Sequence, residues 1–566
     1  MTTIAIQLDG VTLQARPGET LAATLTAHGI RDFRTTRRVQ SRGMFCGMGI
    51  CEDCLVEVDG RANQRACMIK IDRPMQVRRE MHARPLPDVA TVHPPLLIDD
   101  VAIEYPEFLV IGAGPGGMSA AIAARHAGLE VTVLDERSYP GGQYFKQITA
   151  VGPDVKGPDA QHRAGADLIK TALDLGVIIR SGVVVWGAFE PHEFVATEEG
   201  RTIRFQPRAT LVATGAYERG WPVPGWTLPG VMTTGAAQTL WRTARRLPGR
   251  RVLIAGNGPL NLQLAAELIG GGAEVVAVVE AAGQPGWRDA ADLLSMLINS
   301  PGLMMDGLRY HGRRISGGTP MIHGMVVGSI TVSGNGLSVG LRDGDGFDVG
   351  RTFEADAVCL GYGFEPSNEL LRALGCGHDF DPVSRQLRTR RDDDGRTEAP
   401  GIYAVGDCTG LGGAKAALAE GTIVALAVAR DLDRPLGADL LGLEHRSRAK
   451  LQRHRQFQSL LWKVFAAPGY SAKLASPDTL VCRCEEVTFG QIDAALTEGM
   501  RSIGAVKRCT RAGMGRCQGR YCAPVLDTLL TERLGLSRDE YSGFAPRVPI
   551  KPISIEDLAR TRSESR

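Results

Sequence analysis

Two glycine-rich turns constrain the fold of this 566-residue chain more than any other part of its sequence. The first lies in FLVIGAGPGGMSAAIAARHAGLEVTVLDE, residues 108–136. This stretch combines an apolar strand, a G-x-G-x-x-G turn, a helix and a second strand. Glycines in such a turn permit a tight bend, close approach of a pyrophosphate and close packing of helix on strand. The turn therefore predicts a dinucleotide-binding unit in an α/β protein.

The first turn supplies several candidate cofactor contacts. Gly112, Gly114 and Gly117, with Pro115, open a helix whose N-terminal amides can face phosphates. Asp135 ends the next strand, where a carboxylate should bind a ribose hydroxyl, and its neighbour Glu136 is the second candidate. The alternative is a purely structural glycine-rich turn. The agreement of strand, helix and acid favours the dinucleotide site.

The second turn, GNGPLN at 256–261, departs from this pattern. Gly256 and Gly258 are retained, but Asn261 stands where the third glycine belongs, at the close approach of helix and strand. Glu280 ends the following strand and could bind a ribose, and its charge would repel a 2′-phosphate. The sequence thus disfavours NADPH. It leaves open whether this unit binds NADH or is degenerate and kept for its shape.

Four of the twelve cysteines lie near the N-terminus. Cys46, Cys51 and Cys54 follow the C-x4-C-x2-C spacing of plant-type [2Fe–2S] proteins. A strand, an Asp-Gly turn and a return strand can bring Cys67 back beside them. A four-cysteine zinc site is the rival, but structural zinc sites usually pair two short cysteine hooks. Three ligands from one loop favour the iron–sulfur cluster.

A second set of cysteines lies near the C-terminus. Cys482-x-Cys484 is followed at a distance by Cys517-x4-Cys522, and each pair precedes a predicted helix. Because C-x-C is an uncommon zinc hook, these four also favour a cluster over zinc. We expect Cys509 to pack rather than to bind metal. Residues 70–480 hold only isolated cysteines, so a redox disulfide is not predicted, and Cys408 is expected to be a small buried residue.

Composition excludes several classes of function. The formal net charge of +2 gives no reason to expect nucleic acid as a partner. The N-terminus lacks the pattern of a signal peptide, and no apolar run is long enough to span a membrane. We therefore expect a cytoplasmic protein, with room for peripheral association with the inner membrane through a complex.

Changes in pattern along the chain predict its division into domains. Residues 83–105 hold four prolines without a clear period, which is typical of a linker. The predicted parts are a plant-type [2Fe–2S] ferredoxin-like domain (1–85), a linker (86–105), an FAD-binding domain (106–248 and 345–435), an inserted NAD-binding-like domain (249–344), a helical connector (436–477), a second [2Fe–2S] domain (478–535) and a tail (536–566).

The middle of the chain resembles the thioredoxin-reductase-like branch of two-dinucleotide flavoproteins. The resemblance rests on GGQ at 141–143, VATGA at 212–216 and YAVGDCTG at 403–410. It implies FAD at the first turn and adds contacts to it, with Asp407 at the flavin side. The alternative for Asp407 is an ordinary turn aspartate. The contacts that the resemblance implies are Gly142, Gln143, Thr214, Gly215, Gly406 and Asp407.

Nearly the whole chain resembles a fusion of the ferredoxin-like and FAD subunits of the hydrogen cyanide synthase, opine oxidase and D-hydroxyproline dehydrogenase family. The segments that carry this are FCGMGICEDC…RAC, DER…GGQ, VGDCTG and CRCEEVT…GMGRCQGRYC. The N-terminal two-thirds also resembles the sarcosine oxidase alpha subunit. The implied fold is α/β and multidomain. Two Rossmann-like domains are flanked by an N-terminal β-grasp domain and a small helical domain like that of bacterioferritin-associated ferredoxin.

The resemblance also implies a function for the chain. A separate D-amino-acid-oxidase-like subunit with its own FAD would oxidise a C–N bond of an amino acid or opine. This chain would pass the electrons through FAD and two [2Fe–2S] clusters to an acceptor such as a quinone, with an FMN at the subunit interface. No catalytic acid or base is identified. The alternatives are a self-contained NADH-dependent reductase, a component of a hydrogen cyanide synthase that acts on glycine, and a scaffold with inactive cofactor sites.

Overall fold

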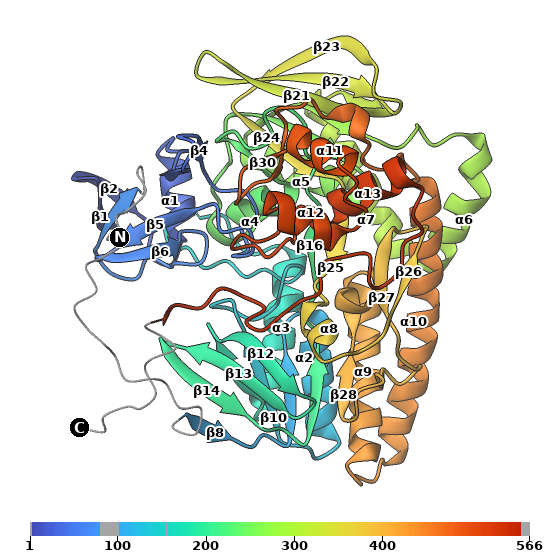
Figure 1. The fold of residues 1–566 in the computed structure, drawn as a ribbon. Coiled ribbons are helices and arrows are strands. Elements are labelled where there is room, and N and C mark those ends of the chain that lie inside the picture. Colours follow the sequence, from blue (N-terminus) through green and yellow to red (C-terminus); the bar gives the residue numbers. More distant parts are fainter. Residues whose placement is uncertain (1–2, 80–100, 154, 556–566) are drawn as a thin grey trace.

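The computed structural model describes residues 3–79, 101–153 and 155–555, which form two small terminal domains around two α/β domains (Figure 1). Most of the predicted linker at 86–105 lies outside the described residues. Its end does not, because Ala102–Glu104 form strand β8, which pairs with β14 (Arg201–Phe205). The predicted linker therefore extends too far, since its composition carries no sign of this long-range pairing.

The N-terminal domain is a five-stranded sheet in the order β2-β1-β7-β5-β6, covered by one helix. Strands β1 and β2 pair antiparallel around the Asp9-Gly10 turn, and a short helix follows them. Thr20 caps the helix by accepting a hydrogen bond from the backbone N–H of Ala23. The elements are β1 (Ile4–Leu8), β2 (Val11–Ala15), α1 (Leu21–Ala27), β3 (Arg34–Thr35), β4 (Ser41–Arg42), β5 (Leu55–Val58), β6 (Arg61–Arg65) and β7 (Met75–Arg79).

The first α/β domain holds a parallel sheet in the order β11-β10-β9-β15-β28 and a second sheet, β12-β13-β14-β8. The first glycine turn joins β9 to α2, as predicted. Helix α9 packs directly on α2, because a Cβ on Gly421 would lie within 3.0 Å of the Gly116 carbonyl oxygen. The elements are β9 (Phe108–Ile111), α2 (Pro115–His126), β10 (Val131–Asp135), α3 (Ala160–Asp174), β11 (Ile178–Ser181), β12 (Val184–Glu190), β13 (Glu193–Glu198), β15 (Ala209–Val212), α8 (Glu369–Ala373), β26 (His378–Asp381), β27 (Gln386–Thr389), β28 (Ile402–Ala404) and α9 (Ala414–Asp431).

The second α/β domain is larger than the predicted 249–344. Its parallel sheet, β17-β24-β18-β19-β20, includes two strands that the sequence assigned to the FAD domain. Both limits are wrong because β17 and β24 reach this sheet by pairing with distant strands. The elements are β16 (Ala216–Glu218), β17 (Val231–Thr233), α4 (Thr234–Ala244), β18 (Arg251–Gly256), α5 (Pro259–Gly271), β19 (Glu274–Glu280), α6 (Ala290–Asn299), α7 (Pro301–Ser316), β20 (Met321–His323), β21 (Met325–Ser333), β22 (Gly336–Asp343), β23 (Asp348–Ala355), β24 (Ala357–Gly361) and β25 (Phe364–Pro366).

The C-terminal part begins with one long helix and continues into a small helical domain. The helix confirms the predicted helical connector, and the tail after the last helix runs back to the first α/β domain (Figure 1). There the Ile550 N–H donates to the Trp186 carbonyl oxygen at 2.8 Å. The elements are α10 (Ala438–Val464), β29 (Leu480–Cys482), β30 (Val487–Thr488), α11 (Phe489–Thr497), α12 (Ile503–Thr510) and α13 (Ala523–Leu534).

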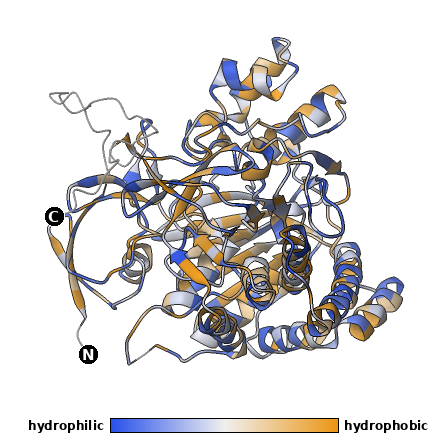
Figure 2. Cartoon of the chain, turned by 90° about the horizontal axis from the view of Figure 1, so that it is seen from below, coloured by the Kyte–Doolittle hydropathy of each residue, from blue (hydrophilic) through white to orange (hydrophobic). Residues whose placement is uncertain are grey.

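Hydrophobic strands fill the interior, and the peripheral helices mix hydrophobic and hydrophilic residues (Figure 2). Among the helices of the described part of the chain, none is both long and apolar enough to cross a membrane.

Candidate functional site

A cavity of about 1560 Å³ lies between the two α/β domains and receives most of the predicted cofactor residues. Met48 and Ile50 of the N-terminal cysteine loop also line it, so one cavity borders both the glycine turn and the cysteines. Gly117, Gly256, Gly258 and Glu280 do not line this cavity. The predicted residues that do are Gly112, Gly114, Pro115, Asp135, Glu136, Gly142, Gln143, Thr214, Gly215, Gly406, Asp407 and Cys46.

The glycines of the first turn fall into two kinds. A Cβ on Gly112 or Gly117 would lie within 3.0 Å of backbone atoms, so the fold itself requires glycine at both positions. Gly114 differs, because a Cβ there would meet no heavy atom of the described residues within 4 Å. The open space lies at the N-terminus of α2, where a pyrophosphate would approach. The turn therefore fits a dinucleotide.

Asp135 and Glu136 have different surroundings. Asp135 accepts hydrogen bonds from the backbone N–H groups of Ala113 and Arg137, at 2.6 and 2.8 Å, which orients its carboxylate at the glycine turn. Glu136 forms ion pairs with Arg65 of the N-terminal domain and Lys551 of the tail. Burial opposes ionisation of Glu136, but the two cations hold its pKa below the usual value. Asp135 is thus the better placed candidate for a ribose contact, and Glu136 joins three parts of the chain.

Asp407 lies at the cavity wall, at the turn between β28 and α9. One carboxylate oxygen accepts from the N–H groups of Gly412 and Gly413, at 3.0 and 2.9 Å. Burial raises the pKa of the carboxyl group. Cys408 is fully buried and its thiol contacts the carbonyl oxygens of Val212 and Val405, which confirms its prediction as a packing residue.

The second glycine turn reproduces part of the first. Glu280 accepts from the N–H groups of Gly258 and Ala282, both at 3.0 Å, much as Asp135 does in the first domain. Asn261 fills the close approach of helix and strand. Its side chain accepts from the Thr234 hydroxyl at 2.8 Å and donates to the Gly361 carbonyl oxygen at 3.1 Å. Asn261 therefore replaces the missing glycine contact by hydrogen bonds that tie α5 to α4 and β24.

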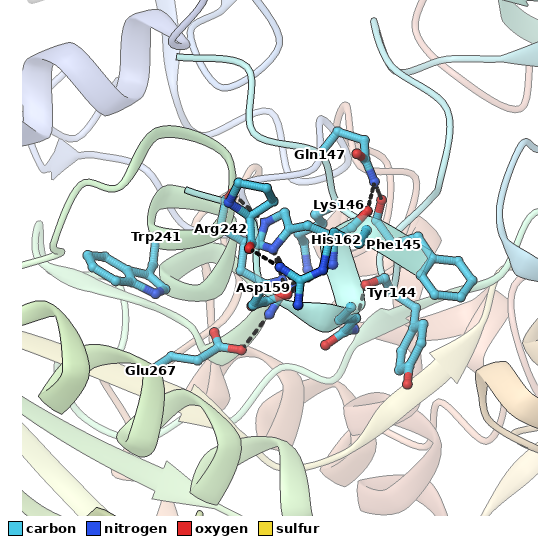
Figure 3. Close-up of polar contacts among 12 residues, drawn as sticks. Tyr144, Phe145, Lys146, Gln147, Asp159, His162, Trp241, Arg242 and Glu267 are labelled. Atoms are coloured by element: carbon cyan, nitrogen blue, oxygen red, sulfur yellow. Dashed lines mark hydrogen bonds and ion pairs between the residues drawn. The ribbon is translucent and has the colours of Figure 1, made fainter. Parts of the chain in front are cut away.

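A polar cluster beside the cavity, in which Arg242, His162 and Lys146 are buried, was not predicted (Figure 3). Arg242 pairs with Asp159 at 3.2 Å and with Glu267 at 2.8 Å. His162 contacts Asp159 at 2.7 Å, and together with Arg242 it lowers the pKa of that carboxyl group against the opposing effect of burial. Lys146 lies nearby, and burial lowers the pKa of its ammonium to about 7. Asp159 and His162 share the first turn of α3. Arg242, Glu267 and Lys146 come from other parts of the chain, so no local pattern marks the cluster as a whole.

The four N-terminal cysteines are buried and meet in one place. The Cys46 sulfur is in hydrogen-bonding contact with the thiols of Cys51 and Cys67, and Cys67 with that of Cys54. The backbone N–H of Cys51 donates to the Cys46 sulfur at 3.4 Å. Four converging thiols with an N–H directed at sulfur form a donor set that suits an iron–sulfur cluster.

The four C-terminal cysteines meet in the same way. The Cys484 sulfur lies 3.9 Å from that of Cys482 and 3.6 Å from that of Cys517. The Cys482 thiol also contacts that of Cys522, which is the N-cap of α13. Cys509 does not belong to this set. It is exposed on α12, so its prediction as a packing residue is wrong.

Family models match three segments of the chain. Residues 1–82 match a 2Fe-2S iron-sulfur cluster binding domain, and residues 480–532 match a BFD-like [2Fe-2S] binding domain. Residues 106–421 match the pyridine nucleotide-disulphide oxidoreductases. The chain thus contains an FAD-binding domain of the pyridine nucleotide-disulphide oxidoreductases between two [2Fe–2S]-binding domains, as predicted. A zinc-binding interpretation of the two cysteine sets is not supported.

Curated relatives cover most of the chain. The A-type subunit of opine oxidase from Agrobacterium tumefaciens is 34% identical, over 81% of this chain and 92% of that relative. The HcnB subunit of hydrogen cyanide synthase from Pseudomonas aeruginosa is 32% identical, over 81% of this chain and 99% of that relative. The alpha subunit of sarcosine oxidase from Rhizobium meliloti is 26% identical, and the matching region covers 42% of it.

A solved structure shares the fold. L-proline dehydrogenase from P. horikoshii superposes with a TM-score of 0.71 over 99% of this chain and 98% of that chain, at 19% sequence identity. The fold, the three matched domains and the curated relatives agree with one another. The chain is a flavin and iron–sulfur oxidoreductase subunit that belongs to the family of the opine oxidase A-type and hydrogen cyanide synthase HcnB subunits, within the pyridine nucleotide-disulphide oxidoreductases.

Proposed function

We propose that this chain is the electron-transfer subunit of a heteromeric dye-linked amino-acid or opine dehydrogenase. A partner subunit resembling D-amino-acid oxidase, with its own FAD, would oxidise the C–N bond. The names of the relatives, which are subunits of opine oxidase, hydrogen cyanide synthase and sarcosine oxidase, support this role. A quinone-like molecule is the proposed acceptor, and an FMN at the partner interface is part of the same proposal.

One observation carries the proposal. The cavity that fits the dinucleotide is also lined by Cys46, and no second cysteine belongs to the described residues of its wall. A disulfide reductase needs a pair of cysteines beside its flavin. Here the neighbour of the flavin site is a cysteine set suited to a cluster, which carries one electron at a time. The arrangement supports passing electrons onward rather than reducing a disulfide.

The residues of this chain bind and orient the cofactors. FAD, when bound, would supply the exchange between two-electron and one-electron chemistry. Asp135 and the N-terminal amides of α2 would hold its ribose and pyrophosphate, and Asp407 its flavin side. We assign Cys46, Cys51, Cys54 and Cys67 as ligands of one cluster, and Cys482, Cys484, Cys517 and Cys522 as ligands of the other.

The test is co-expression with a D-amino-acid-oxidase-like protein, if the neighbouring reading frame encodes one, followed by a substrate screen with an artificial dye. We expect the two proteins to purify together and to reduce the dye with an amino acid or opine. The Cys51→Ser variant should lose dye reduction while FAD stays bound. If the chain still reduced the dye after losing this cluster, the proposed passage of electrons through it would be wrong.

An NADH-dependent reductase is the second candidate, because Glu280 keeps the orientation of a ribose-binding acid. Adding NADH to the purified chain and following flavin absorbance separates the two. The electron-transfer role predicts no fast loss of flavin absorbance after NADH is added. A fast, stoichiometric loss would favour the reductase.

A further inference from the structure

The two cysteine sets lie at opposite ends of the sequence but side by side in the fold. Phe45 precedes Cys46, Tyr521 precedes Cys522, and the centroids of these two rings are 5.3 Å apart. Cys46, Cys51 and Cys517 belong to one buried apolar cluster together with both rings. The shortest connection between the two sets therefore passes through packed protein rather than through solvent.

An ion pair joins the same two loops. Arg483 stands between Cys482 and Cys484, and its Nε lies 2.6 Å from Oδ2 of Asp53, the residue before Cys54. The guanidinium carbon also lies 3.8 Å from the centroid of the Phe45 ring. The side chains of Arg483 and Asp53 are only 4% and 0% exposed. A cation so deeply buried acts on both cysteine sets with little screening by water.

The Tyr521 hydroxyl is a second unusual group at this contact. It is buried, and it has no hydrogen-bond partner among the described residues. Burying a donor without a partner is costly, so such a group usually has an acceptor. Its ring packs on Phe45, and the sulfur atoms of a cluster held by Cys46 and Cys51 would provide acceptors there. Tyr521 thus fits a cluster at the N-terminal set although it belongs to the C-terminal loop.

The two cysteine sets differ in how deeply they are buried. All four N-terminal cysteines are buried, and Cys46 lines the cavity of the flavin site. In the C-terminal set Cys484 is partly exposed. The N-terminal set is therefore the inner one, beside the flavin, and the C-terminal set is the outer one, towards solvent.

We propose that the two clusters form a single conduit, inner to outer, and that Arg483 and Tyr521 are positioning residues that couple them. An electron that passed from the inner to the outer cluster would oxidise the first and reduce the second, and no bond or proton would change place. The proposal rests on the proposed function only in requiring that both clusters are present. It differs from a scheme in which each cluster serves its own electron partner.

The test is a redox titration of the full chain, with both clusters verified by iron analysis and followed by electron paramagnetic resonance. Variants that lack one cluster assign the signals. In the fully reduced wild-type chain we expect magnetic interaction between the two clusters. Because a nearby cation favours the more negative, reduced state, Arg483→Gln should move both midpoint potentials to more negative values.

Arg246→Gln is the matched control. It removes a contact of 2.7 Å to Glu19, which is fully buried, so it also breaks an ion pair between the N-terminal domain and the rest of the chain. We expect it to leave both potentials unchanged. Tyr521→Phe, which removes only an unpaired hydroxyl, should shift the inner cluster alone to a more negative potential. This variant decides the matter if Arg483→Gln loses iron.

Two independent signals without interaction at full reduction, or a Tyr521→Phe variant with both potentials unchanged, would overturn the proposal. These measurements need neither the partner subunit nor an amine. If the clusters interacted but no amine led to dye reduction, the proposed function would be wrong and the proposed conduit would still stand.

Discussion

The neighbouring acids Asp135 and Glu136 allow a specific test of the flavin site, because their carboxylates make different contacts. In Asp135→Asn, one of the two oxygens that accept the N–H groups of Ala113 and Arg137 becomes an amide group that cannot accept. A hydrogen bond to a charged group contributes roughly 1.5–3 kcal/mol. Asp135→Asn also turns the charged acceptor offered to a ribose hydroxyl into a neutral amide. Loss of a charged hydrogen bond of this size to the ribose, at about 1.4 kcal/mol per tenfold change, should weaken FAD binding roughly 10- to 100-fold.

Glu136→Gln is the matched control at the next position. It removes the charge that pairs with Arg65 and Lys551, whose side chains are 23% and 25% exposed. Because the three groups are partly screened, the cost in unfolding free energy should be about 1–2 kcal/mol, with little change in FAD affinity. The pKa of Glu136 is lowered in the folded chain, so this contribution is present above its unfolded pKa of about 4.3 and is lost as the pH falls through the folded value.

The assay is reconstitution of the flavin-free chain with FAD, read by flavin fluorescence, beside urea unfolding of both variants. The expected result is weaker FAD binding in Asp135→Asn and reduced stability with normal FAD binding in Glu136→Gln. If Glu136→Gln loses FAD and Asp135→Asn does not, the assignment of the two acids is reversed and the reasoning fails.

Three further predictions concern other parts of the chain. Gly117→Ala should lower the yield of folded protein, because its Cβ would meet the Gly112 carbonyl oxygen. Gly114→Ala should fold and only weaken FAD binding. If the two variants behaved alike in unfolding experiments and FAD titrations, the distinction between these glycines would be wrong. Burial raises the pKa of the Glu218 carboxyl group to about 7 in the folded chain. The folded chain therefore loses stability as the pH rises above the pKa that this group has in the unfolded chain and through 7. Glu218→Gln should therefore stabilise the chain against urea by up to about 3 kcal/mol at high pH but not at pH 4, and a gain independent of pH would contradict this. Cys484→Ser should abolish one of the two cluster signals and lower the iron content, while Cys509→Ser, at an exposed position, should change neither.

The parts of the fold that could be predicted are those with a local signature. The strand, glycine turn and helix at 108–126 follow from side-chain period and turn chemistry, and so does the spacing of the cysteines within each loop. Strands β17 and β24 could not be placed in the second domain, because β24 pairs with β18, which is distant in sequence, and β17 reaches the sheet only through β24. For the same reason the pairing of Glu136 with Lys551 and the contact of Arg483 with Asp53 could not be predicted. Long-range contacts leave no period in a single sequence.

The second α/β domain supports the inner cysteine set, whatever nucleotide it binds. The backbone N–H of Thr233, at the start of α4, donates to the Phe45 carbonyl oxygen at 2.9 Å. A Cβ on Gly47 would lie 2.9 Å from the Ala236 Cα, so the cysteine loop rests directly on α4. The buried residues of α4 and α5 also share one hydrophobic core with those of the N-terminal domain.

Asn261 links this support to the altered glycine turn. Its hydrogen bond to Thr234 fixes the first turn of α4, the helix on which the cysteine loop rests. A glycine at 261 would allow closer packing of α5 on β18 but could not hold α4 by a side chain. The residue that departs from the nucleotide-binding pattern therefore stabilises the surface that carries the inner set. We infer that the shape of this domain is needed for placing that set beside the flavin cavity, even if no nucleotide binds at Glu280.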